Sequence, residues 1–128
     1  MDILTADHAG VVRVAGAKMA KSAGNLVLVS DLLKEYSAAA VRLLILDRRW
    51  DQDWDFSPAG LDAAAARLER LHAAAGRAER DVAGDGAPAV AAMRAALARD
   101  LDVPTALRIA EEEGGQAARS LGTLLGLW

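Results

Sequence analysis

Hydrophobic residues in this chain recur mainly at helical spacing. The apolar positions fall three or four apart within residues 38–50, 58–81 and 103–113, and again after a break at residues 84–88. This spacing places apolar side chains on one face of a helix and predicts amphipathic helices that pack together. The stripes expected in the core are Val41, Leu44 and Ile45; Leu61, Ala64, Ala65, Leu68, Leu71 and Ala75; Val90, Met93 and Leu97; and Leu121, Leu124, Leu125 and Trp128.

Polar residues at the segment boundaries predict where these helices begin and end. A serine or aspartate before a helix can accept a hydrogen bond from the first turn, and a glycine pair can end a helix. Proline at the first helical position needs no hydrogen-bond partner. The expected starts are Ser30 for a short helix through Tyr36, Ser37 for 38–50, Ser57-Pro58 for 58–81 and Asp102 for 103–113, which Gly114-Gly115 should end.

Only the first 30 residues favour extended structure. The β-branched clusters are residues 11–14 (VVRV) and 26–29 (LVLV), and they flank a loop. We therefore expect a mostly α protein, in which a small extended part over residues 1–36 precedes a helical bundle over residues 37–128.

Composition excludes several classes of function. The chain has 128 residues, 30 of them alanine, with a formal net charge of -3, so no general polyanion-binding surface is expected. It has no cysteine, and His8 and His72 are far apart, so no metal site is expected. No apolar run reaches the length of a membrane span and no signal peptide is recognisable, which favours a cytoplasmic protein.

One loop carries candidate chemistry. Residues 18–25 (KMAKSAGN) place two lysines in a Ser/Gly/Asn turn. A lysine ammonium on a mobile loop can follow charge that develops on a pyrophosphate leaving group. The spacing is not that of a Walker A loop. Taken alone, these eight residues fit a solvated surface turn better than a phosphate site.

The residues around the loop resemble class I aminoacyl-tRNA synthetases. Residues 16–25 (GAKMAKSAGN) are similar to the G-x-KMSKS-x-GN signature of that family. HAGVV before the loop and DLLKEY after it resemble the cysteinyl branch. AVRL at 40–43, DLDVPTAL at 100–107 and the ending LLGL recur in the same order, so the resemblance spans nearly the whole chain.

This resemblance implies the C-terminal part of a cysteine-activating enzyme that uses ATP. Residues 1–36 would end a Rossmann-like catalytic domain, and residues 37–128 would form a tRNA-stem- or anticodon-binding bundle for tRNA(Cys). By resemblance, Lys21 binds ATP and stabilises the pyrophosphate, and Lys18 assists it. The implied ATP-binding residues are Lys18, Lys21, Ser22, Gly24 and Asn25.

The departures from the family pattern limit what the chain can do alone. The HIGH motif and the zinc-binding cysteines of the family are absent, so zinc is expected only in a separate catalytic part. Ala20 stands where the signature has serine, which predicts a weakened loop. Because one lysine loop cannot position both substrates, we expect no activity without the rest of a catalytic domain.

Two further interpretations stay open. The ligase that joins cysteine to the glucosamine-inositol precursor of mycothiol shares the loop and the bundle, and GNLVLVS at 24–30 resembles it particularly well. Alternatively, the chain is a helical module that binds tRNA or a protein without catalysis.

The arginines and aromatic residues of the bundle can each be interpreted as tRNA-binding or as structural. Arg42, Arg48 and Arg49, with Arg67, could form a local patch for a tRNA stem, but pairing with the interspersed acids is favoured. The aromatic residues of the segment WDQDWDF, which are Trp50, Trp54 and Phe56, are expected to pack on the bundle rather than stack on a base. Glu111 to Glu113 are expected to be a solvated helix end.

Overall fold

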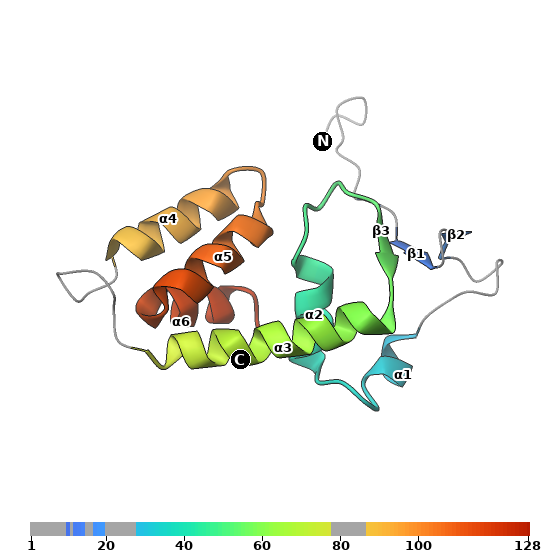
Figure 1. The fold of residues 1–128 in the computed structure, drawn as a ribbon. Coiled ribbons are helices and arrows are strands. Elements are labelled where there is room, and N and C mark those ends of the chain that lie inside the picture. Colours follow the sequence, from blue (N-terminus) through green and yellow to red (C-terminus); the bar gives the residue numbers. More distant parts are fainter. Residues whose placement is uncertain (1–9, 11, 15–16, 20–27, 78–86) are drawn as a thin grey trace, which may run out of the picture.

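A computed structural model describes residues 10, 12–14, 17–19, 28–77 and 87–128 of the chain. The described part is mostly α, as predicted, with a small sheet near the N-terminus (Figure 1). In chain order its elements are β1 (Val12–Val14), β2 (Ala17–Lys18), α1 (Val29–Leu32), α2 (Ala38–Leu46), β3 (Trp54–Phe56), α3 (Pro58–Ala75), α4 (Ala87–Ala98), α5 (Val103–Glu113) and α6 (Gly115–Leu124).

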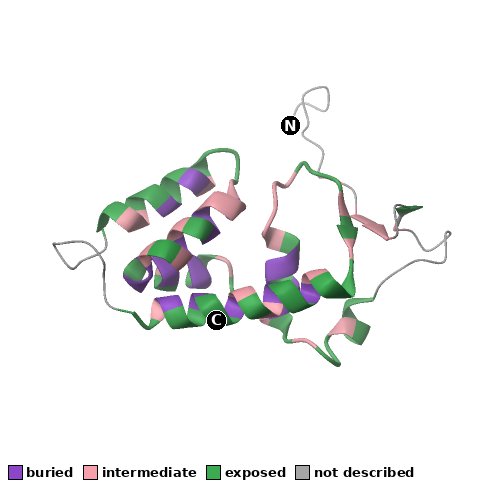
Figure 2. Ribbon diagram, viewed as in Figure 1, coloured by how far each residue is buried: buried purple, intermediate pink, exposed green. Residues whose placement is uncertain are grey.

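Helix α3 runs along the length of an elongated molecule, and the other elements lie beside it (Figure 1). Helices α4, α5 and α6 lie beside its C-terminal half, and α2 and the sheet lie toward its N-terminal half (Figure 1). Buried residues line the facing sides of these helices (Figure 2). They form a large cluster, which includes Leu43, Leu71, Met93, Leu107 and Leu121, and a smaller cluster of Val41, Leu44, Leu61 and Ala64.

Three of the four predicted N-caps are confirmed. The Ser37 and Ser57 hydroxyls each accept a hydrogen bond from the backbone N–H three residues on, at 3.1 Å. The Asp102 carboxylate accepts one from Thr105 N–H at 3.3 Å, and Gly114 ends α5. The Ser30 cap is wrong, because α1 begins after Leu28 without a side-chain cap and Ser30 lies inside it.

Three helices end earlier than predicted, and one of them is α1, which ends at Leu32 instead of Tyr36. Helix α2 ends at Leu46 instead of Trp50, and α3 ends at Ala75 instead of continuing toward Asp81. The guanidinium of Arg48 donates to the Leu44 carbonyl at 2.7 and 3.0 Å. That carbonyl is the one that the Arg48 N–H would need in a continued helix, so the side chain occupies it.

Three residues predicted to lie in core stripes are exposed. Ile45, Leu124 and Trp128 are 50%, 52% and 44% exposed. Leu43, which was in no predicted stripe, is buried in the large cluster instead of Ile45, and Leu127 is buried there whereas Leu124 is not. The turn after α6 contains Gly126 at φ 69°, and it brings Leu127 back against the bundle.

The sheet has the strand order β2-β1-β3. β1 and β2 form a short antiparallel hairpin, and β1 pairs in parallel with β3, with Val12 opposite Trp54 and Val14 opposite Phe56. Of the second predicted extended segment, residues 26 and 27 lie outside the described residues, and Val29 begins α1 instead. The predicted boundary at 36/37 falls between α1 and α2, and the sheet joins strands from both sides of it.

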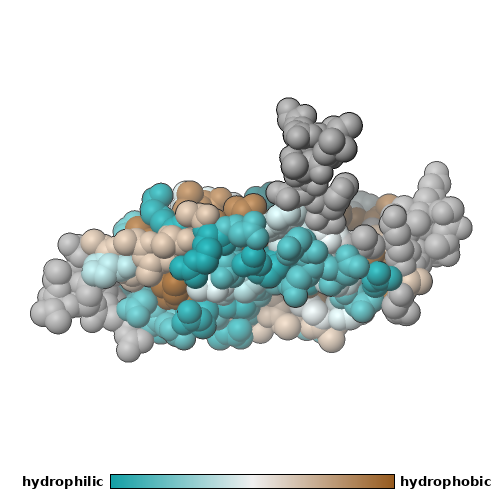
Figure 3. Space-filling model, turned by 90° about the horizontal axis from the view of Figure 1, so that it is seen from above, coloured by the Kyte–Doolittle hydropathy of each residue, from teal (hydrophilic) through white to brown (hydrophobic). Residues whose placement is uncertain are grey.

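No described helix is both long and apolar enough to cross a membrane. Seen from above, hydrophilic residues cover much of the middle of the molecule (Figure 3).

Candidate functional site

The structure describes the beginning of the lysine loop (residues 18–25) and the chain that follows it from Leu28 onward. On its N-terminal side, Lys18 lies in β2, and Met19 N–H donates to the Val12 carbonyl at 2.9 Å. On its C-terminal side the description resumes at Leu28, just before α1. The predicted ATP-binding residues Lys21, Ser22, Gly24 and Asn25 lie outside the described residues, so their roles stay predictions.

Glycine allows the strand that leads to the loop to approach the bundle closely. Gly10 N–H donates to the Trp50 carbonyl at 2.7 Å, and Arg13 forms an ion pair with Asp53 at 3.1 Å. A Cβ atom on Gly10 would lie 1.6 Å from the Gln52 carbonyl oxygen. Only glycine fits this contact, which attaches the start of β1 to the segment before β3.

The segment that follows α1 is attached to α3 by a hydrogen bond. The Tyr36 hydroxyl donates to the Asp62 carboxylate at 2.8 Å, and this hydrogen bond raises the pKa of the Tyr36 phenol. Leu32 and Tyr36 also pack against the smaller core cluster, as do Trp54 and Phe56. The expectation that the aromatic segment packs on the bundle is therefore confirmed for Trp54 and Phe56.

Each arginine predicted for tRNA contact is bound within the chain. Arg42 donates to the Gly126 carbonyl at 2.9 Å. Arg48 lies 3.7 Å from the centre of the Trp54 ring, and burial lowers its pKa, with Asp47 acting in the opposite direction. Arg49 pairs with two aspartates, Asp100 at 2.8 Å and Asp102 at 3.8 Å.

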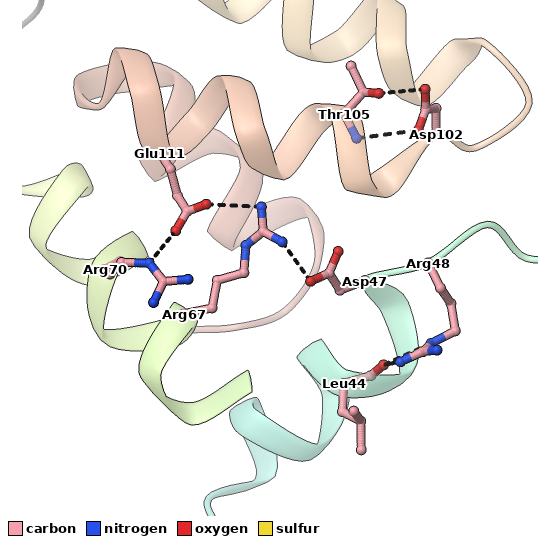
Figure 4. Close-up of polar contacts among 8 residues, drawn as sticks. All are labelled: Leu44, Asp47, Arg48, Arg67, Arg70, Asp102, Thr105 and Glu111. Atoms are coloured by element: carbon pink, nitrogen blue, oxygen red, sulfur yellow. Dashed lines mark hydrogen bonds and ion pairs between the residues drawn. The ribbon is translucent and has the colours of Figure 1, made fainter. Parts of the chain in front are cut away.

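Arg67 links three helices through its guanidinium (Figure 4). It pairs with Asp47, the C-cap of α2, at 2.7 Å and with Glu111 of α5 at 2.9 Å. Arg70 contacts the other Glu111 oxygen at 2.8 Å. The expectation of a solvated Glu111 is therefore wrong, because both of its carboxylate oxygens accept an arginine. A signal was present in the sequence, since Arg67 lies three residues after Ala64 on the apolar side of α3.

A second polar link joins the segment before β3 to the start of α5. Trp50 Nε1 donates to Asp100 at 3.2 Å, beside the ion pair of Arg49. The Thr105 hydroxyl donates to the Asp102 carboxylate at 2.7 Å, and this hydrogen bond lowers the pKa of Asp102. Residues 50 and 100 are far apart in sequence, and no local pattern indicated this contact.

Between the sheet and α2 lies an apolar hollow of about 430 Å³. Its walls include Val12, Val41, Leu44, Trp54 and Phe56. Within the described ranges, no group of three or more His, Asp or Glu residues could hold a metal ion. This geometry offers an apolar contact surface next to the loop rather than an acid–base site.

Known proteins share both sequence and fold with this chain. Residues 5–66 match the family described as the tRNA synthetases class I (C) catalytic domain. A LeuRS of Agrobacterium radiobacter K84, solved in a ternary complex with tRNA and LeuAMS, has the same fold over 94% of this chain and 20% of its own. The TM-score is 0.64 and the sequence identity 20%. The chain is a class I synthetase-like domain.

More narrowly, the chain is homologous to a group of cysteine ligases. The L-cysteine:1D-myo-inositol 2-amino-2-deoxy-alpha-D-glucopyranoside ligase of Thermobispora bispora is 45% identical over 102 residues, which are 80% of this chain and 25% of the ligase. The ligase of that name from Streptomyces coelicolor is 42% identical over 123 residues, 93% of this chain and 29% of the ligase. The chain thus spans less than a third of these relatives.

Proposed function

We propose that this chain supplies the lysine loop and the helical bundle of an ATP-dependent ligase that joins cysteine to an amino-sugar–inositol acceptor. The observation that carries the proposal is the 42% identity to the Streptomyces coelicolor ligase over 93% of this chain. The ligase would act in the cytoplasm. It would be active only when this region is joined to the rest of a catalytic domain, because the loop alone cannot position cysteine and ATP.

In this proposal the loop acts on ATP. The cysteine carboxylate attacks the α-phosphorus of ATP, cysteinyl-adenylate forms and pyrophosphate leaves. Lys21 stabilises the charge that develops on the pyrophosphate, Lys18 assists it, and Ser22, Gly24 and Asn25 shape the loop. The β1–β2 hairpin holds the start of the loop, and further along the chain the Tyr36–Asp62 hydrogen bond attaches the segment after α1 to α3. Any zinc that binds the substrate thiol would belong to the rest of the catalytic domain.

Lys21→Ala tests the role of the loop in a full-length protein. The protein is a chimera, defined here as the Streptomyces coelicolor ligase with its matching segment replaced by this chain. We expect the cysteine-dependent exchange of pyrophosphate into ATP to fall about 100-fold or more, because one stabilising charge is lost from the transition state. Lys34→Ala is the matched control, because its ammonium is exposed on the turn after α1. Equal exchange rates in the two variants would contradict the proposed role.

A cysteinyl-tRNA synthetase with tRNA(Cys) as acceptor is the second candidate. In its favour, the bundle shares its fold with a LeuRS that was solved with tRNA. Against it, Arg42, Arg48 and Arg49 already bind carbonyls or carboxylates of this chain. We therefore expect no gel retardation of tRNA(Cys) by the chain at low salt. Retardation that weakens with salt and is lost in Arg42→Gln would favour the synthetase, or a tRNA-binding module without catalysis.

A further inference from the structure

Large exposed hydrophobic residues gather on α1 and α2. Leu28, Val29, Leu33 and Ile45 are each 46–51% exposed, and together they form what we call the α1/α2 apolar face. The other large hydrophobic residues exposed in the described part are Leu101 between α4 and α5, Leu124 at the end of α6 and Trp128 after α6. A gathering of this kind marks an interaction surface, whereas single exposed leucines do not.

The α1/α2 apolar face is continuous with two hollows. One is the apolar hollow of about 430 Å³ beside the sheet, and the other, of about 440 Å³, extends over Leu33 and Arg42. Val29, Val41 and Ile45 line both hollows, so the two open side by side. The surface is therefore shaped to receive apolar side chains rather than to stand in water.

The neighbouring sheet is incomplete in the same region. Parallel strands are normally found in sheets that are covered on both faces, and β1 pairs with β3 in parallel. The strands have only two or three residues, too few for a stable sheet alone. Trp54 and Phe56 pack the sheet against the smaller core cluster. Any further cover of the sheet must come from residues outside the described part of the chain.

We propose that the α1/α2 apolar face is the surface on which the rest of a class I catalytic domain packs, so that this domain positions the lysine loop. The inference rests on the proposed function. Every residue of the face lies within residues 5–66, the part that matches a catalytic domain, whereas Leu101, Leu124 and Trp128 lie outside it. The Streptomyces coelicolor ligase also has the material to cover the face, because this chain spans only 29% of it.

Thiol labelling tests this interface without any need for catalysis. The chain has no cysteine, so single variants Ile45→Cys and Leu33→Cys each report one position. Maleimide labelling, read by peptide mass spectrometry, is compared between the isolated chain and the chimera. We expect both thiols to react at least about tenfold more slowly in the chimera. The control Leu124→Cys, which is equally exposed, should react at the same rate in both.

Several labelling results would overturn the proposed interface. Equal labelling of Ile45→Cys in the chain and in a monodisperse chimera would show that the catalytic domain does not cover the face. Protection that appears in the isolated chain as its concentration rises would assign the face to a second copy. If the chimera is not monodisperse, the chain is co-expressed with the rest of the ligase, and absence of protection there also overturns the proposal. A protected chimera that lacks Lys21-dependent exchange would count against the loop, not the interface.

Discussion

Gly10→Ala is expected to separate β1 from β3 and to lower the free energy of unfolding by about 1–3 kcal/mol. The new Cβ would lie 1.6 Å from the Gln52 carbonyl oxygen and 2.1 Å from its carbon. Both are backbone atoms, so no side-chain rotation can relieve the overlap. The chain must move away, and the hydrogen bond from Gly10 to the Trp50 carbonyl is lost. Urea denaturation measures the stability, and hydrogen exchange of peptides over residues 10–19 and 50–57 locates the change.

Gly76→Ala is the matched control for this substitution. Gly76 follows α3 with φ −83°, and the nearest atom to an added Cβ lies at 3.6 Å. Alanine fits there without strain and reduces the freedom of the unfolded chain, so a gain of about 0.4–1 kcal/mol is expected. If Gly10→Ala leaves hydrogen exchange in the sheet unchanged, the close approach of β1 to the bundle is not as described.

The helix starts were predictable because capping is local. Ser37, Ser57 and Asp102 each bind a backbone N–H three residues on, so a short window of sequence contains both partners. The end of α2 was not predictable in this way. It depends on the Arg48 side chain, which turns back to the Leu44 carbonyl and at the same time stacks on Trp54.

Contacts between distant residues account for the other differences. β1 pairs with β3 about forty residues later, and the extended segment that precedes the lysine loop therefore belongs to the same sheet as the aromatic segment. Likewise Glu111 looked solvated because its partners, Arg67 and Arg70, lie on another helix. The motifs around the loop identified the class of protein, but its ATP-binding residues other than Lys18 lie outside the described part of the chain.

Leu121→Ala and Leu124→Ala are expected to differ in cost, although both residues belong to one predicted stripe. Leu121 is fully buried in the large cluster, so its truncation should lower the free energy of unfolding by about 2–5 kcal/mol. Leu124 is 52% exposed, so its truncation should lower the free energy of unfolding by less than about 1 kcal/mol.

The difference has a structural cause at the end of α6. The helix buries Ala117, Ala118 and Leu121, and it ends at Leu124. After the turn at Gly126, Leu127 is buried in the large cluster, whereas Leu124 stays on the exposed side of α6. Urea denaturation of the two variants, with unchanged m-values, measures the costs. Equal costs would contradict the exposure of Leu124, because its truncation would then remove as much buried contact as the truncation of Leu121.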